Sequence, residues 1–362
     1  MRARFSARVR LVQFISDLVY ADAVSSDCLE LHRVFQRWGF EAAIYAGRRD
    51  SHHQRVAQEL SAYRYREGDL VLFHYSAWSG VAQFLLELGK PLVLAYHNIT
   101  PPEFFGRVSP QAREVAQRGI DALPRFVPLA RLALGDSEFN RQELEGAGFK
   151  TTGVMPILVD FQRLDGEPNR EILRDYDDDY VNFLFVGRVD PNKRQEDIIK
   201  LLYYYRRCNP KSRLFLVGAH SPGGPYHAWM QGLVDHLGLR GDVHFTGQTS
   251  HRDLLSFYRL ADFFVCMSEH EGFCVPIVES MYLGIPVVAY AAAAVPHTMG
   301  QAGVLVKRKD YGAIAELIQM VTSDRALRSR LVARGRERAR DFSRERVEQI
   351  LAGYIAQVLQ DV

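Results

Sequence analysis

The chain has 362 residues, of which 47% are apolar and 24% are charged, with a formal net charge of +2. This composition excludes a disordered or low-complexity protein, and the length favours two domains over one. The four cysteines (Cys28, Cys208, Cys266 and Cys274) show no paired or metal-type spacing, which favours a reducing cytoplasm over a disulfide framework. No stretch reaches the ~18 apolar residues needed to span a bilayer, and the first apolar run is too short for a secretory signal.

Basic residues gather near both ends of the chain, at Arg2, Arg4, Arg8 and Arg10 and again between Arg325 and Arg346. Such clusters are either solvated surfaces or sites of attraction to an anionic membrane. We therefore expect a cytoplasmic protein, with peripheral contact at the inner face of the cell membrane as the alternative. The net charge of +2 by itself excludes neither a nucleic acid nor a membrane, and we expect no nucleic-acid partner.

Short apolar runs alternate with helical patterns such as Cys28–Trp38, Gly80–Leu88 and Gln195–Arg207. The predicted strands are Val9–Ile15, Glu41–Tyr45, Leu70–Tyr75, Leu92–His97, Leu132–Ser137, Asn182–Gly187, Arg213–Gly218, Val243–Gly247, Phe263–Met267, Pro286–Ala289 and Gly303–Val306. This alternation predicts α/β domains with parallel sheets covered by helices on both faces. A polar break at Asp165–Asp179 divides the chain, so we expect two doubly wound domains facing across a cleft.

Two cations follow the predicted strand that ends at Gly187, namely Arg188 and Lys193. Ligands of open α/β sheets bind beyond the carboxyl ends of strands, where such cations can clamp a diphosphate and stabilise a leaving group. The alternative is a basic surface turn. A second strand closes at Gly218, and a third at Gly247.

The segment Glu271–Glu279 carries two carboxylates around an expected helix start. Gly272 permits close approach of a ligand, Pro276 suits a first helical turn, and Gly284 suits the helix end. A helix N-terminus offers N–H groups to an anion, and neighbouring carboxylates accept hydrogen bonds from hydroxyl groups. A sugar attached to phosphate combines both features.

The order Gly187-Arg188-x4-Lys193, Val217-Gly218, Val243-x-Phe-x-Gly247, Leu254-x3-Tyr258-x2-Ala261-Asp262 and Glu271-x7-Glu279 resembles the retaining GT-B glycosyltransferases of family 4. The resemblance implies a GT-B fold and nucleotide-sugar binding by the C-terminal half. It assigns the donor diphosphate to Arg188 and Lys193, the ribose hydroxyls to Glu279 and the sugar to Glu271. The implied donor-binding residues are Gly187, Arg188, Lys193, Gly218, Gly247, Glu271, Gly272, Phe273, Cys274, Val275 and Glu279.

In the N-terminal half, Leu92–Asn98 resembles the strand end that places a histidine beside the reacting carbon in this family. His97 is therefore an implied catalytic residue, together with Glu271, Arg188 and Lys193. The run His97–Phe105 resembles a subset that acts in bacterial surface polysaccharide assembly. Weaker acceptor-side candidates are Asp22, Ala23, His74, Asn98 and Ser137. The first strand–helix loop, Asp17–Ser25, lacks the glycines of many relatives, so it either binds phosphate through Ala23 and Val24 or faces the acceptor.

The resemblance predicts an acceptor-binding domain at 1–165, a nucleotide-sugar domain at 166–340, and a helix at 341–362 that crosses back to the first domain. It implies transfer of a hexose, with a mannose-type sugar on GDP slightly favoured over UDP-sugars, to a glycan or lipid-linked acceptor. We expect neither a cofactor nor a metal ion, because the acids Asp175, Asp177 and Asp179 lie in a polar linker. The rival functions are a glycoside hydrolase with paired carboxylates, a nucleotide-sugar epimerase, and a non-catalytic partner of another transferase.

Overall fold

The computed structural model describes residues 9–20, 22–106, 108–220 and 223–360, and the chain divides into two compact units. The first unit joins Met1–Val159 to Phe342–Val362, and the second comprises Asp160–Asp341. The sequence places this break after residue 165. The 3-10 turn η4 (Phe161–Asp165) instead belongs to the second unit, because the Phe161 ring stacks on Tyr282 at 4.4 Å between centroids and the Tyr282 hydroxyl donates to Asp165.

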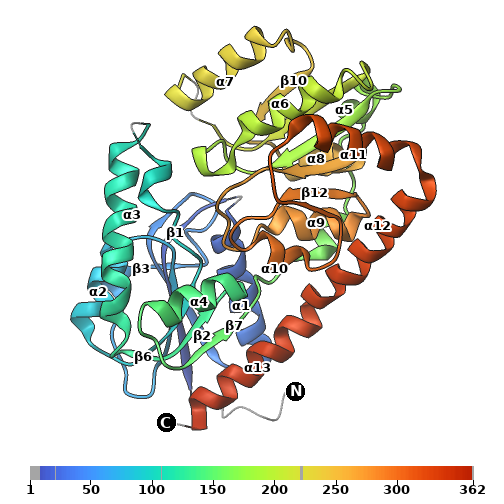
Figure 1. Ribbon diagram of the computed structural model, residues 1–362. Helices are drawn as coiled ribbons and strands as arrows, with labels where there is room; N and C mark the ends of the chain where they lie inside the picture. Colours follow the sequence, from blue (N-terminus) through green and yellow to red (C-terminus); the bar gives the residue numbers. More distant parts are fainter. Residues whose placement is uncertain (1–8, 21, 107, 221–222, 361–362) are drawn as a thin grey trace. The chain divides into compact units, whose positions relative to one another are not determined.

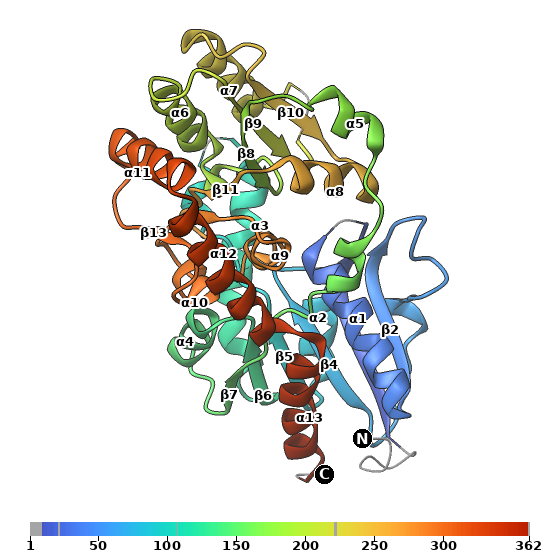
Figure 2. The same ribbon diagram turned by 90° about the vertical axis from the view of Figure 1, so that its right-hand side faces the viewer.

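The first unit is built on a parallel sheet in the order β3-β2-β1-β4-β5-β6-β7 (Figures 1 and 2). Its strands are β1 (Arg10–Leu18), β2 (Glu41–Arg49), β3 (Gln58–Glu59), β4 (Leu70–Tyr75), β5 (Leu92–Tyr96), β6 (Ala130–Gly135) and β7 (Thr152–Val154). Five of them fall on predicted runs. The short strands β3 and β7 carry too few apolar residues to be recognised from the pattern.

Alternate side chains of the central strands point to opposite sides of the sheet. Because both sides are apolar, helices cover both faces. Val71 and Phe73 of β4 belong to one apolar cluster, while Leu70 and Leu72 belong to another. The second cluster includes Leu351 of the last helix, which runs beside the sheet in Figures 1 and 2. The helical segments of this unit are α1 (Ala23–Trp38), η1 (Leu60–Ala62), α2 (Gly80–Leu88), η2 (Pro102–Phe104), α3 (Pro110–Ala122), η3 (Leu123–Phe126), α4 (Glu138–Gly146) and α13 (Arg344–Gln360).

The second unit repeats the arrangement with the order β10-β9-β8-β11-β12-β13, again with parallel neighbours. Its strands are β8 (Val181–Val186), β9 (Ser212–Val217), β10 (Val243–Gly247), β11 (Phe263–Cys266), β12 (Val287–Tyr290) and β13 (Val304–Val306). All six fall on predicted runs. The direction of winding reverses between β8 and β11, and ligands of such sheets bind at the carboxyl ends beside this switch point.

The helical segments of the second unit are η4, α5 (Arg170–Asp175), η5 (Pro191–Lys193), α6 (Gln195–Tyr205), α7 (Pro225–His236), α8 (His251–Leu260), α9 (Val275–Leu283), α10 (Val295–Met299), α11 (Tyr311–Ser323) and α12 (Arg325–Ala339). The 3-10 turn η6 (Arg340–Phe342) spans the boundary with the returning segment of the first unit. α12 packs on α9 (Figure 2). Arg338 of α12 donates to the carbonyl oxygens of Thr298 and His297, so part of this basic segment serves packing.

The polar stretch Asp165–Asp179 lies inside the second unit, contains α5 and ends in acids that form ion pairs. Asp178 accepts from Arg213, and Asp179 pairs with Lys211 at 2.6 Å. These acids hold the polypeptide beside the start of β8. Among the described residues, no helix has the length and apolar character that crossing a bilayer requires. The predicted basic positions Arg2, Arg4 and Arg8 lie outside the described residues.

The packing of α13 in the first unit generates a stability prediction at Gly153. A Cβ at this position would overlap the hydroxyl and ring of Tyr354, whose hydroxyl accepts from Val154 N at 3.1 Å. We expect Gly153→Ala to lower the free energy of unfolding by ~1–3 kcal/mol. The matched control is Gly353→Ala in α13, where the new Cβ meets open space and should be neutral or stabilise by up to ~1 kcal/mol. Urea unfolding of both variants checks this, and equal stabilities would contradict it.

Candidate functional site

Three glycines line the carboxyl edge of the second sheet. Gly187 and Gly218 have φ angles of 154° and 149°, a region that favours glycine. A side chain on Gly218 would overlap the carbonyl oxygen of Gly187. The N–H of Gly218 donates to the carbonyl of Gly247 at 3.1 Å, and Gly187 N donates to Val217 at 2.9 Å. The backbones of β8, β9 and β10 therefore end side by side without side chains between them, which leaves their edge open to close approach.

A buried ion pair lies at the switch point of this sheet. Lys193, in the turn after β8, donates from Nζ to Oε2 of Glu271, which follows β11, at 2.7 Å. The lysine side chain is 19% exposed and the glutamate side chain 8%. Burial alone would lower the pKa of Lys193, but the Glu271 carboxylate and the neighbouring Cys274 together raise it above its ordinary value. Lys193 is therefore a fixed positive charge at the carboxyl edge.

The turn that carries Lys193 is tied to the segment that carries Glu271. Asn192 donates from its side chain to the carbonyl of His270 at 3.0 Å, and its own carbonyl accepts from Glu269 N at 2.9 Å. Arg188 differs from Lys193, because its side chain is 75% exposed and its nearest carboxylate, Asp190, is 3.5 Å away. The site therefore combines one fixed cation with one that can move.

The predicted helix after Glu271 forms as α9, with Pro276 in its first turn and Gly284 as its left-handed C-cap. Cys274 is the N-cap and adopts φ 70°, a conformation uncommon for a residue with a side chain. Phe273 is fixed through its carbonyl, which accepts from the Thr298 hydroxyl. The segment from Gly272 through Phe273 and Cys274 to Val275, the first helical residue, thus leads to a helix N-terminus, where N–H groups without intrahelical acceptors favour an anion.

Glu279 lies one turn into α9 and accepts a 2.5 Å hydrogen bond from the hydroxyl of Tyr258 in α8. Burial raises the pKa of Glu279, although this hydrogen bond opposes the rise. The second carboxylate oxygen gives Glu279 the capacity for a further hydrogen bond. Glu271 and Glu279 thus occupy different surroundings, one beside an ammonium and the other beside a phenol.

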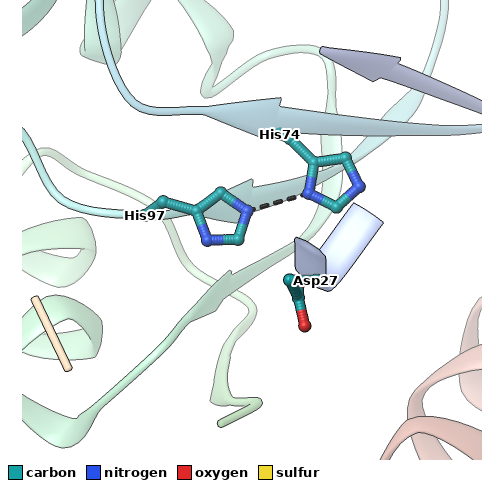
Figure 3. Close-up of side chains that lie close together, drawn as sticks. All are labelled: Asp27, His74 and His97. Atoms are coloured by element: carbon teal, nitrogen blue, oxygen red, sulfur yellow. Dashed lines mark hydrogen bonds between the residues drawn. The ribbon is translucent and has the colours of Figure 1, made fainter. Parts of the chain in front are cut away.

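In the first unit, two histidines from neighbouring strands meet in a buried hydrogen bond (Figure 3). His74 of β4 and His97, which follows β5, join Nδ1 to Nε2 at 2.8 Å. His74 Nε2 contacts the side-chain oxygen of Gln13 at 2.9 Å, and His97 Nδ1 contacts Asp136 at 3.0 Å. Both ring nitrogens of His97 are therefore engaged within the unit.

The charges around the two rings set the directions of their pKa shifts. Because the Asp136 carboxylate only accepts, His97 Nδ1 carries the proton of that hydrogen bond. Burial and the charge of His97 hold the pKa of His74 well below its usual value. Burial would also lower the pKa of His97, but the Asp136 carboxylate outweighs it and raises this pKa.

Asp27 of α1 lies beside this histidine pair (Figure 3). One ligand atom from each of Asp27, His74 and His97 lies within 4.8 Å of the other two, which is close enough to hold a metal ion. The ring centroids of His74 and His97 are 5.1 Å apart, and the angle between the ring planes is 7°. The two bonded nitrogens therefore lie almost on the line that joins the ring centroids. The nitrogens therefore point at each other rather than at a common ion, and we interpret the cluster as a hydrogen-bond network.

The remaining acceptor-side candidates serve local structure. Asp22 caps α1 by accepting from Ser25 N at 2.9 Å, and Ala23 is the first residue of that helix. The expected loop Asp17–Ser25 is therefore shorter than predicted, because β1 extends to Leu18 and the helix begins at Ala23. Ser137 caps α4.

Asn98 adopts φ 67° and donates to Asn140 at 3.1 Å and to Glu143 at 2.7 Å. Its side-chain amide is thus engaged by α4, the helix that Ser137 caps. These hydrogen bonds give Asn98 a structural role beside His97.

Comparison with known proteins connects this geometry to one family. Residues 167–338 match the family model of glycosyl transferases group 1. The matched residues all lie in the second unit. The chain is 29% identical over 304 residues to D-inositol 3-phosphate glycosyltransferase of Thermobifida fusca, covering 79% of this chain and 69% of that protein. It is 31% identical over 170 residues to O-antigen chain mannosyltransferase B of Escherichia coli, covering 45% and 42%.

Solved structures extend the likeness of fold to the whole chain. Sucrose-phosphate synthase from Thermosynechococcus elongatus superposes with a TM-score of 0.78 at 21% identity, covering 98% of this chain and all of that one. HepE of Anabaena, solved in complex with UDP and glucose, gives 0.74 at 18% identity, covering 96% and 100%. The fold is therefore GT-B, as the sequence motifs predicted.

Several residues that contact the predicted site residues were not predicted from the sequence. Gln13 interrupts the apolar run of β1, and a polar side chain at a buried strand position is the signal that could have revealed it. Asp27 gave no such signal, because it stands within an ordinary amphipathic helix. Asn192 and Cys266 lie beside recognised motif residues, but their contacts come from distant segments.

Asp27 generates a prediction about the pH dependence of stability. Burial raises its pKa to about 7, while Oδ1 accepts from Leu158 N at 2.8 Å and Oδ2 is buried without a protein donor. A carboxyl whose pKa rises on folding stabilises the fold below its unfolded pKa of about 3.8, and this stability is lost as pH rises through about 7. The variant Asp27→Asn keeps the acceptor for Leu158 but has no carboxyl to titrate. We expect its free energy of unfolding, relative to that of the wild type, to rise by ~1–3 kcal/mol when the pH is raised from about 5 to about 8.

Urea unfolding at both pH values checks this, and Asp177→Asn provides an exposed control in the second unit that should not alter the pH dependence. Parallel pH profiles for wild type and Asp27→Asn would contradict the assignment.

Proposed function

We propose that the protein is a retaining glycosyltransferase of the family 4 type, which moves a hexose from a nucleoside diphosphate sugar to an acceptor hydroxyl. The observation that carries this proposal is the buried Lys193–Glu271 pair at the switch point of a glycine-edged sheet. The arrangement brings an ammonium for phosphate and a carboxylate for sugar hydroxyls together from two separate loops. The match to the group 1 family model covers both loops and supports the proposal.

In the proposed reaction, the bond between the anomeric carbon and the diphosphate oxygen breaks, and a bond from that carbon to the acceptor oxygen forms on the same face. The acceptor proton passes to the departing diphosphate. Lys193, Arg188 and the N-terminus of α9 would stabilise the charge on the leaving group. Glu271 would orient the sugar and Glu279 the ribose, since both are hydrogen-bond acceptors fixed by neighbours.

The family resemblance implies that His97 lies beside the reacting carbon. Because both of its ring nitrogens are hydrogen-bonded within the unit, we propose a different role for it. Held by Asp136 and His74, its ring would be a positioning element of the first unit rather than a free acid or base. The proposed acceptor is a glycan or a lipid-linked oligosaccharide. We propose assembly of a surface polysaccharide such as O-antigen as the context, supported by the likeness to the Escherichia coli mannosyltransferase.

Mannose from GDP-mannose is the proposed donor sugar, supported by the same relative and by the run His97–Phe105. UDP-sugars are the competing donors. Thermal stabilisation by each of GDP, UDP, GDP-mannose and UDP-glucose at equal concentration ranks them, because the stabilisation by a ligand that binds the native state grows with the logarithm of its concentration over Kd. A larger Tm shift with the uridine compounds would overturn the choice of base.

Lys193 provides the test of the mechanism. Lys193→Ala removes one preorganised charge from the leaving group, so we expect kcat to fall ~10²-fold or more. Lys211→Ala is the matched control, since Lys211 pairs with Asp179 on the surface and should keep wild-type kcat. Nucleotide release that depends on added acceptor measures transfer and separates it from hydrolysis of the donor. Near-normal kcat in Lys193→Ala, with Tm unchanged, would refute the phosphate site.

A further inference from the structure

Two thiols and a carboxylate converge beside Lys193 in the second unit. Cys266 ends β11, Cys274 caps α9, and Glu271 lies between them in sequence. One ligand atom from each of the three lies within 4.8 Å of the other two. The two thiols are hydrogen-bonded to each other, and Cys266 also contacts the Ser268 hydroxyl at 3.2 Å. Thiols that meet beside a carboxylate differ from cysteines that merely fill an apolar core.

We propose that Cys266, Cys274 and Glu271 form a binding site for a thiophilic divalent cation of the Zn²⁺ class. Thiolate sulfur and carboxylate oxygen are both zinc ligands, at ~2.3 Å and ~2.1 Å, so ligands of one ion lie ~3–4 Å apart. Side-chain movements of about 1 Å would bring the three atoms to these separations. The fourth tetrahedral position remains for water.

Charge balance supports this site. Binding forms two Zn–S bonds and releases both thiol protons to solvent, so the ion and its two thiolates together add no net charge. The Lys193–Glu271 pair remains neutral while Glu271 shares its carboxylate between the ammonium and the ion. Both cysteines are buried, at 0% and 8% exposed, which protects the bound ion.

The ion would regulate the site that the proposed function assigns to the sugar donor. It would fix Glu271 and Cys274, two residues of the segment that is proposed to read the donor. Ion and donor then exclude each other, and Zn²⁺ inhibits transfer. This consequence rests on the proposed function, whereas binding of the ion does not.

Binding is tested on the full chain with Cd²⁺, whose bonds to thiolates give an ultraviolet charge-transfer absorption. Under a phosphine reductant, we expect one Cd²⁺ per chain in wild type and loss of the signal in Cys266→Ala and Cys274→Gly. Glycine suits position 274 because it adopts φ 70° without strain. Cys208→Ser, which changes an exposed cysteine, should keep the signal. Absence of the signal in wild type, or its persistence in Cys266→Ala with native Tm, would overturn the site.

Inhibition is tested separately with Zn²⁺ in the transfer assay. We expect Zn²⁺ to raise the apparent KM for the donor at least ~10-fold in wild type, and to leave Cys266→Ala unaffected. Because Zn²⁺ also binds free nucleotides, equal inhibition of both proteins would mean chelation of the donor and would refute the regulatory role. If Cd²⁺ binds but no donor supports transfer, the metal site stands and the proposed function fails. If transfer occurs without Cd²⁺ binding, the reverse holds.

Discussion

The candidate donor site depends on one buried ion pair, between Lys193 and Glu271. Taking an ammonium and a carboxylate out of water costs several kcal/mol per ion, and their attraction repays this only with good geometry. The structure provides that geometry at 2.7 Å and adds backbone bonds through Asn192 that hold the two loops together. Such a pair is a poor choice for stability alone, since apolar residues of similar volume would serve at least as well. In the proposed function, the pair holds a charge ready at the strand switch point.

The glycines around this pair have a related physical cause. β8 and β9 approach so closely at their carboxyl ends that a side chain on Gly218 would overlap the Gly187 carbonyl. A sheet edge without side chains leaves backbone N–H groups and the nearby helix N-terminus as the surface that meets a ligand. The charge of Lys193 therefore acts beside backbone dipoles, and both favour an anion. The first unit has the corresponding strand order with β7 added at one edge, but it places histidines and acids at the ends of its central strands.

The sequence predicted the features that depend on local pattern. The apolar runs predicted all six strands of the second sheet, and Pro276 and Gly284 marked the two ends of α9. The spacing of the family motifs predicted the GT-B fold. Contacts between distant segments were beyond reach, because no local pattern records that Asp27 of α1 lies beside His97 of β5 or that Phe161 stacks on Tyr282. The same limit made the break at residue 165 differ from the observed one.

Cys274 shows how local strain and chemistry meet at one residue. Its left-handed conformation would suit glycine, so the thiol is held at a backbone position that costs of order 1 kcal/mol. The backbone alone is what a phosphate-binding helix start requires, and glycine would provide it without strain. The thiol must therefore be explained by its own contacts, which are Cys266 and the surroundings of Glu271. A strained residue that brings a second thiol to a carboxylate is more consistent with ligand chemistry than with packing, and this argument connects the donor site to the proposed metal site.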